Sequence, residues 1–135
     1  MATLLRYMFL PLVVGFFIFV VTCLIGPDNV PDMPPGIAWD KLAHFAMFFI
    51  LSAVSLFDYF KLHNGHPFIF RWILWGFVIP VVYGAGIELL QKYLFTSRSA
   101  EWGDWLADML GSLVATLFAI IYLQKGKKRR KNIPL

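Results

Sequence analysis

Four long apolar runs separated by polar segments are the dominant pattern of the chain. The first run extends from Tyr7 to Ile25. At about 1.5 Å per helical residue it reaches roughly 28 Å, which is enough to cross the hydrocarbon layer of a bilayer. The pattern therefore predicts four transmembrane helices, at about residues 4–25, 40–60, 68–94 and 104–123.

Polar and proline-rich segments mark the ends of the predicted helices. Four prolines between residues 27 and 35 should make the first connection stiff and extended rather than helical. Asp40 can cap the second helix, and the fourth helix starts near Asp104. Pro80 lies inside the third helix, where a proline removes a backbone hydrogen bond, so we expect a kink there.

The composition favours a membrane protein over a soluble domain. Of the 135 residues, 59% are hydrophobic and 15% are charged, and the mean hydropathy is +0.69. A soluble domain of this length has too little interior to bury so much apolar surface. We expect an all-α fold, with one four-helix transmembrane bundle over residues 1–124, short loops, and a basic tail over 125–135. The single cysteine, Cys23, excludes a disulfide within the chain.

Positive charges gather on one side of the predicted membrane. The side that holds the termini carries Arg6, Lys61, Arg71 and the tail cations Lys125, Lys127, Lys128, Arg129, Arg130 and Lys131. The other side carries only Lys41, Lys92 and Arg98. Because lysine and arginine are enriched in cytoplasmic loops, both termini are expected in the cytoplasm. The tail directly follows an apolar segment, which indicates contact with anionic lipid headgroups rather than with nucleic acid.

Polar residues converge at the opposite, extracytoplasmic end of the predicted bundle. Helices two and four begin there and helix three ends there, so their terminal residues reach one membrane level. The residues concerned are Asp40, Lys41, His44, Glu88, Gln91, Arg98, Glu101, Asp104 and Asp108. An ionisable group costs roughly 2.5–3.5 kcal/mol at a helix centre in the membrane, so several of them together predict a functional cavity. The alternative is that they only cap helices and hold them together.

Two rows of residues run along the fourth predicted helix. The polar row, spaced four residues apart, consists of Asp104, Asp108, Ser112 and Thr116. The small-residue row beside it consists of Ala107, Gly111, Ala115 and Ala119. Because small residues at this interval let another helix approach closely, we expect the fourth helix to pack centrally with its polar row facing the bundle interior.

The order of these polar residues resembles the VanZ-like family of small bacterial multi-helix membrane proteins. The resemblance covers roughly residues 37–120 and rests on Asp40-Lys41-x-x-His44, Glu88-x-x-Gln91, and Arg98 followed by Asp104, Asp108 and Gly111. Family members usually carry asparagine where this chain has Asp108. The resemblance implies a place in the bacterial inner membrane and an envelope role. The family's named member confers low-level resistance to the glycopeptide teicoplanin.

Two chemical interpretations of the cluster stay open. In the first, an enzyme or carrier acts on a lipid-linked anionic substrate at the outer leaflet, with Lys41 and Arg98 holding its oxygens. His44 would be a general acid or base oriented by Asp40 or Glu88. The candidate catalytic residues are His44, Glu88 and Asp104, and the candidate ligand-binding residues are Asp40, Lys41, Gln91, Arg98 and Asp108. In the second, the protein is a non-catalytic scaffold or binds a lipid, a glycopeptide or a partner protein.

A metal site is the weaker expectation. His44, Glu88, Asp104 and Asp108 offer nitrogen and oxygen ligands. However, the sequence has no His-Glu-x-x-His motif and no pair of histidines at metal-binding spacing, and Lys41 and Arg98 would repel a cation. We therefore expect neither a metal nor a cofactor, and we expect membrane lipids as partners.

Overall fold

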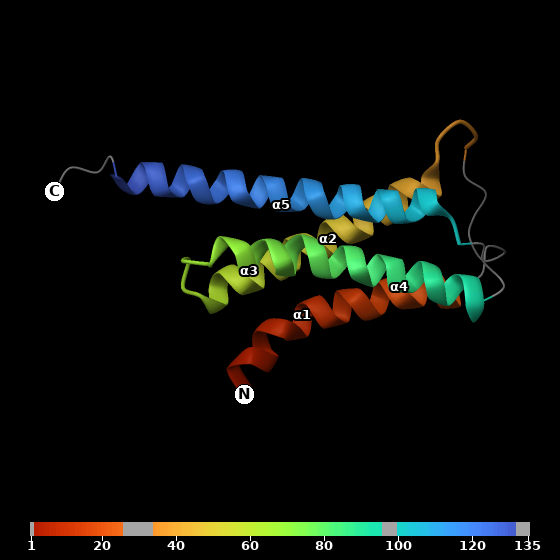
Figure 1. Ribbon diagram of the computed structural model, residues 1–135, viewed down its shortest axis with the longest axis horizontal. Coiled ribbons are helices and arrows are strands. Elements are labelled where there is room, and N and C mark those ends of the chain that lie inside the picture. Colours follow the sequence, from red (N-terminus) through yellow and green to blue (C-terminus); the bar gives the residue numbers. More distant parts are fainter. Residues whose placement is uncertain (1, 26–33, 96–99, 132–135) are drawn as a thin grey trace.

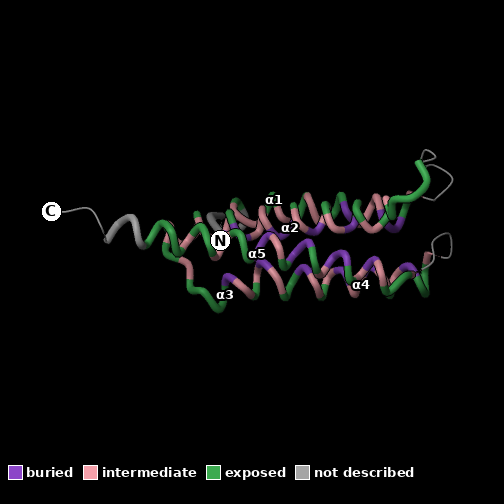
Figure 2. The backbone as a smooth tube through the Cα atoms, turned by 90° about the horizontal axis from the view of Figure 1, so that it is seen from above, coloured by how far each residue is buried: buried purple, intermediate pink, exposed green. Residues whose placement is uncertain are grey.

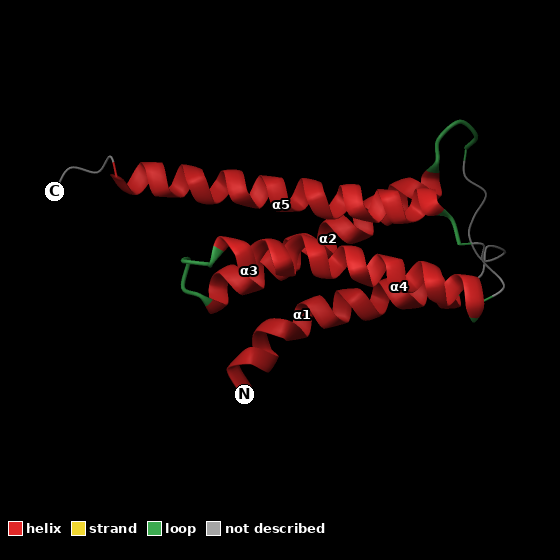
Figure 3. Cartoon of the chain, in the orientation of Figure 1, coloured by secondary structure: helices red, strands yellow, loops and turns green. Residues whose placement is uncertain are grey.

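The computed structural model describes residues 2–25, 34–95 and 100–131, which are helical apart from short connections (Figures 1 and 3). Four stretches are long and apolar enough to cross a membrane: Arg6–Leu24, Trp39–Leu62, Ile69–Tyr93 and Trp102–Lys127. The predictions of an all-α fold and of four candidate membrane spans are thereby confirmed.

The first span consists of α1 (Ala2–Phe19) and a π-helical turn over Val20–Leu24. In this turn the backbone N–H of Ile25 donates to the carbonyl of Val20, 3.1 Å away. The hydroxyl of Thr22 donates to the carbonyl of Ile18 at 2.8 Å, a back-bond that disturbs regular helices. The sequence predicted one regular helix here, so the wider last turn is a difference from that prediction.

The second span is α2 (Trp39–Leu62), close to the predicted 40–60. Ala38 occupies the cap position and Asp40 lies in the first turn, so the prediction that Asp40 caps this helix is wrong. A negative charge in the first turn still favours the helix through its macrodipole. After α2 the chain reverses through Asn64 and Gly65, whose φ angles of 51° and 78° are in the left-handed region.

The third span is divided where the sequence predicted one helix over 68–94. It consists of α3 (Ile69–Ile73), a π-helical turn over Leu74–Val78, and α4 (Ile79–Tyr93). Pro80 is the second residue of α4, so only Ile79 separates it from this turn. A proline has no N–H for the carbonyl four residues earlier, and its ring would collide with that carbonyl, so a wider turn before it relieves the conflict. The kink angle at Pro80 stays a prediction.

The fourth span is α5 (Trp102–Lys131), which is longer than the predicted 104–123. Its start lies two residues earlier, and its end continues through basic residues that the sequence analysis assigned to a tail. Lysine and arginine are good helix formers and favour the negative end of the helix dipole, which explains the extension. In Figure 1 the end of α5 projects beyond the other helices, on the same side as the start of α1.

The central contact of the bundle is between α2 and α5, which lie side by side. Gly111 of α5 lies against the backbone of α2, where a Cβ would collide with the carbonyl oxygen of Phe45. Ala107 and Ala115 of the small-residue row are buried. The polar row is buried too, and it consists of Asp104, Asp108, Ser112 and Thr116. Both rows therefore face the bundle interior, as the sequence predicts.

Large apolar side chains cover the outside of the bundle, while Figure 2 shows the buried positions recurring along the inner faces of the helices. Phe16 of α1 and Phe70 of α3 are 68% and 86% exposed. Soluble proteins rarely expose contiguous apolar surface over four helices. Together with the four candidate spans, this surface indicates a multi-pass membrane protein.

Candidate functional site

A set of ionisable side chains meets at the end of the bundle opposite the start of α1 and the end of α5. The residues that we call the polar cluster are Asp40, Lys41, His44, Glu88, Glu101, Asp104 and Asp108. They come from the first two turns of α2, the last turns of α4, and the first turns of α5 with the residue before it. Three spans thus supply one site, as the sequence predicts.

The innermost contact of the polar cluster joins His44 of α2 to Asp108 of α5. The distance from Nδ1 to Oδ1 is 2.8 Å, and the two residues are only 2% and 0% exposed. With Asp108 ionised, Nδ1 carries the hydrogen and donates it, so Nε2 is the basic nitrogen of the ring. The sequence analysis expected Asp40 or Glu88 to orient His44. The hydrogen bond that the ring makes in the structure is to Asp108 instead, while Asp40 and Glu88 each lie close to His44.

Lys41 connects the start of α2 to the start of α5. Its Nζ lies 2.9 Å from Glu101 Oε2 and 3.2 Å from Asp104 Oδ1. Gly103 leaves room for the lysine stem, since a Cβ there would lie 2.6 Å from Lys41 Cε. From the sequence we expected Lys41 to hold substrate oxygens. In the structure its ammonium is paired with two carboxylates of the protein. Glu101 was expected among the converging polar residues but was given no catalytic or ligand-binding role, because nothing in its spacing distinguishes it from an ordinary loop acid.

Glu88 connects α4 to the residue that precedes α5. Its Oε2 accepts the backbone N–H of Glu101 at 3.0 Å. Its other oxygen, Oε1, is buried and finds no hydrogen-bond partner within the described part of the chain. One carboxylate oxygen of Glu88 is therefore committed to holding the chain before α5, and the other is available to a ligand or a proton.

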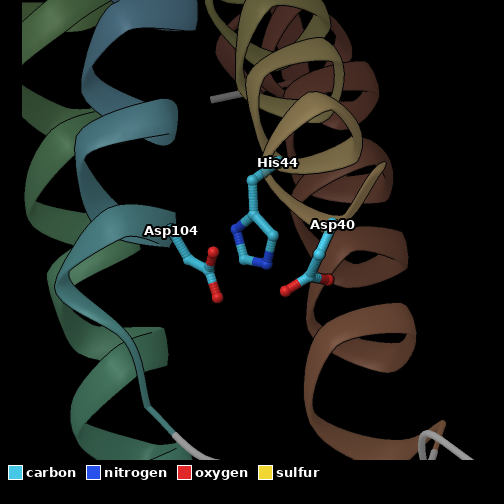
Figure 4. A group of neighbouring side chains, drawn as sticks. All are labelled: Asp40, His44 and Asp104. Atoms are coloured by element: carbon cyan, nitrogen blue, oxygen red, sulfur yellow. The ribbon is translucent and has the colours of Figure 1, made fainter. Parts of the chain in front are cut away.

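His44 lies between two groups of carboxylates. Ligand atoms of Asp40, His44 and Asp104 lie within 4.8 Å of one another, and so do those of His44, Glu88 and Asp108. Figure 4 shows the imidazole ring between Asp40 and Asp104, with both carboxylates turned toward it. The ring therefore has acidic groups at both of its nitrogen atoms.

The two remaining predicted ligand residues are Gln91 and Arg98. Gln91 is buried and donates from Nε2 to the carbonyl of Thr22, 2.8 Å away, which connects α4 to the first span. Its Oε1 has no partner among the described residues. Arg98 lies outside the described residues, so its assignment stays a prediction.

The formal charge of the polar cluster, with its acids counted as ionised, is negative. Five of its side chains are carboxylic acids (Asp40, Glu88, Glu101, Asp104 and Asp108), against one lysine and one histidine. Burial of several carboxylates is unfavourable unless cations or protons compensate them. The described part of the site thus attracts positive charge, and any attraction for an anion must come from another source.

A separate cavity lies toward the other end of the spans, between α1, α2 and the third span. Its volume is about 730 Å³, and aliphatic and aromatic side chains form most of its lining, together with Asp58 and Arg71. The polar cluster contributes no residue to this lining. The cavity is therefore a different feature from the candidate site.

The arrangement supports two kinds of chemistry. His44, oriented by Asp108, can take or give a proton at Nε2. The carboxylates around it can bind a cation.

Comparison of the chain with protein-family models, with curated proteins and with solved structures finds no match.

Proposed function

We propose that the chain is a VanZ-like protein of the bacterial cytoplasmic membrane that binds or acts on a lipid-linked or anionic envelope ligand at its extracytoplasmic end. The observation that carries the proposal is the buried His44–Asp108 pair at the end of the spans. Such a pair is expensive to place at membrane depth and is by default functional.

The orientation in this proposal places both termini in the cytoplasm and the polar cluster outside. The distribution of lysine and arginine supports it, because the basic residues concentrate at the end where α1 starts and α5 finishes. In this orientation the polar cluster faces the compartment in which lipid-linked envelope precursors are exposed.

His44 is the proton-transferring residue of the proposed site, and Asp108 is the positioning residue that fixes its tautomer. Nε2 of His44 then acts on the ligand as a general base or acid. Arg98 is the proposed source of positive charge close to the ligand, because Glu101 and Asp104 already pair with Lys41. An effect on the envelope ligand would alter susceptibility to teicoplanin.

The test is the teicoplanin susceptibility of a sensitive bacterial host that expresses the chain at matched membrane abundance. The wild type should raise tolerance, whereas His44→Gln and Arg98→Ala should not. His66→Gln is the matched control, because His66 lies in the connection at the opposite end of the spans and should retain full activity. No increase with the wild type would reject the resistance trait, and equal activity of His44→Gln and wild type would reject the role of His44.

A second candidate function is a non-catalytic scaffold, and one observation favours it. Lys41, Glu88 and Gln91 each connect two parts of the bundle by a side-chain bond. In a scaffold, conservative substitutions should weaken function in a graded way that follows stability. Lys41→Arg, assayed for both thermal stability and tolerance, separates the two cases, since a catalytic site loses activity while stability is retained.

A further inference from the structure

We infer that Asp40, His44 and Asp104 bind a divalent transition-metal ion of the zinc class (Figure 4). The inference rests on the proposed function for the identity of the ligand that completes the coordination. It changes the role of His44, because a nitrogen that coordinates an ion cannot also take a proton, so with the ion bound His44 is a metal ligand rather than the general base. Binding of the ion itself follows from the arrangement of these side chains.

The spacing of the three ligand atoms suits a metal ion. Atoms that all lie within 4.8 Å of one another have a common centre at most about 2.8 Å from each, against Zn²⁺–ligand distances of about 2.0–2.2 Å. The difference is therefore at most about 0.6–0.8 Å, which rotation of the side chains can close. One imidazole nitrogen and two carboxylates form a donor set that Zn²⁺ accepts.

Nε2 of His44 is the observation that points to a ligand. The residue is 2% exposed, and its only hydrogen bond within the described residues is at Nδ1. Figure 4 shows the ring nitrogen farther from the Cβ atom directed toward Asp40, with the carboxylate of Asp104 beside the ring. A buried basic nitrogen that accepts no hydrogen bond from the described residues is a position for a cation or a proton.

Asp108 and Lys41 are each bonded to one of the metal ligands and hold it in place. A metal-bound histidine usually donates its other N–H to a carboxylate, which fixes the ring and raises its basicity, and Asp108 accepts this bond from His44 at 2.8 Å. Lys41 fixes Asp104 through Oδ1 at 3.2 Å. Both supporting contacts are therefore present.

The repulsion expected from Lys41 is weaker than the sequence suggests. Its ammonium is shared between Glu101 and Asp104, so its charge is offset by protein carboxylates. The polar cluster as a whole is negative, and a divalent cation reduces the cost of bringing its acids together. Metal binding is thus favoured by the local charge.

The metal ion also explains how an acidic site could bind an anion. Asp40 is exposed, whereas His44 and Asp104 are buried, so the coordination positions left open would lie on the Asp40 side. A phosphate or carboxylate oxygen of the envelope ligand could occupy one of them, bridged to the protein by the ion. The ion would then supply the positive charge that attracts an anion to this acidic site.

The first test uses the full-length chain, purified in detergent, stripped with a chelator and titrated with Zn²⁺ against a chromophoric chelator. We expect one ion per chain, and affinity at least about tenfold weaker in His44→Ala and Asp104→Asn. Asp58→Asn is the control, because Asp58 is an acid of the same helix as His44 but lines the separate cavity. No saturable binding, or binding equal in all variants, would overturn the inference.

The second test does not depend on the folding of a variant. X-ray absorption at the zinc edge of the wild-type protein should show a nitrogen and oxygen shell that contains one imidazole. A shell without imidazole overturns the site. Zinc binding without any change in teicoplanin tolerance supports the metal site and counts against the proposed function, whereas tolerance without zinc binding overturns the metal site alone.

Discussion

Gly84 of α4 is in direct contact with Asp108 of α5, since a Cβ atom at position 84 would lie 2.7 Å from Asp108 Oδ2. Asp108 is fully buried and bonded to His44, so its carboxylate has little room to retreat. The glycine therefore allows the third and fourth spans to approach at the level of the candidate site.

Gly84→Ala should destabilise the protein and disturb the site. Overpacking of this kind costs about 1–3 kcal/mol, more than the gain in helix propensity from alanine. Gly86→Ala is a matched control two residues away, where a Cβ would meet no described atom within 4 Å. Thermal unfolding in detergent should separate the two variants, and equal midpoints would contradict the contact.

Gly111→Ala tests the central contact between α2 and α5. A Cβ at this position would collide with the backbone of Phe45, which cannot move aside as a flexible side chain can. We expect a lower unfolding midpoint than for Gly84→Ala and loss of tolerance in the host. Gly126→Ala, toward the end of the same helix and clear of described neighbours, should be at least as stable as the wild type. A Gly111→Ala protein as stable as this control would show that the two helices are farther apart.

Asp108→Asn tests what His44 requires from its partner. An asparagine carbonyl can accept the bond from Nδ1, so we expect stability within about 1 kcal/mol of the wild type. Asp108→Ala leaves a buried donor without its partner and should cost roughly 1–3 kcal/mol or more. The comparison is made by unfolding in detergent. Equal losses in both variants would mean that the carboxylate charge itself is needed.

The orientation of the chain can be measured by cysteine labelling in intact cells. The native cysteine is first removed by Cys23→Ser. A single cysteine is then introduced by Ala100→Cys or by His66→Cys. A reagent that cannot cross the membrane should label position 100 in intact cells and position 66 only after permeabilisation. The reverse pattern would place the polar cluster in the cytoplasm and overturn the proposed orientation.

The spans and the meeting of polar residues could be predicted because each depends on a pattern within one helix. Apolar runs of sufficient length predict membrane spans, and the four-residue spacing from Asp104 to Asp108 predicts a common face. Alternating directions of successive spans then bring α2, α4 and α5 to one end. None of these steps requires knowledge of how each helix is oriented about its own axis relative to its neighbours.

The contacts between helices could not be predicted, because spacing fixes a face and not a partner. His44 could have met several acids, and the choice of Asp108 depends on the closeness that Gly84 and Gly111 allow. The π-helical turn before Pro80 replaces a regular helix through a local backbone adjustment that the apolar pattern does not record. The contacts of Glu101 with Lys41 and Glu88 depend on the path that the chain takes before α5.

Lys41 should be coupled more strongly to Asp104 than to Glu101, although the lysine is closer to Glu101. The side chains of Glu101 and Asp104 are 53% and 5% exposed, at distances of 2.9 and 3.2 Å from Nζ. Exposed ion pairs contribute only about 0–1 kcal/mol, because water screens them and ordering two side chains costs entropy. A buried carboxylate has no water to replace a lost partner.

Double-mutant cycles measure this difference. One cycle combines Lys41→Met with Asp104→Asn and the other combines it with Glu101→Gln, each followed by unfolding in detergent. We expect the coupling with Asp104 to be at least about twice that with Glu101, since only Asp104 is shielded from water. Equal couplings would mean that water reaches Asp104 as freely as Glu101, and the site would then be an open surface rather than a partly enclosed one.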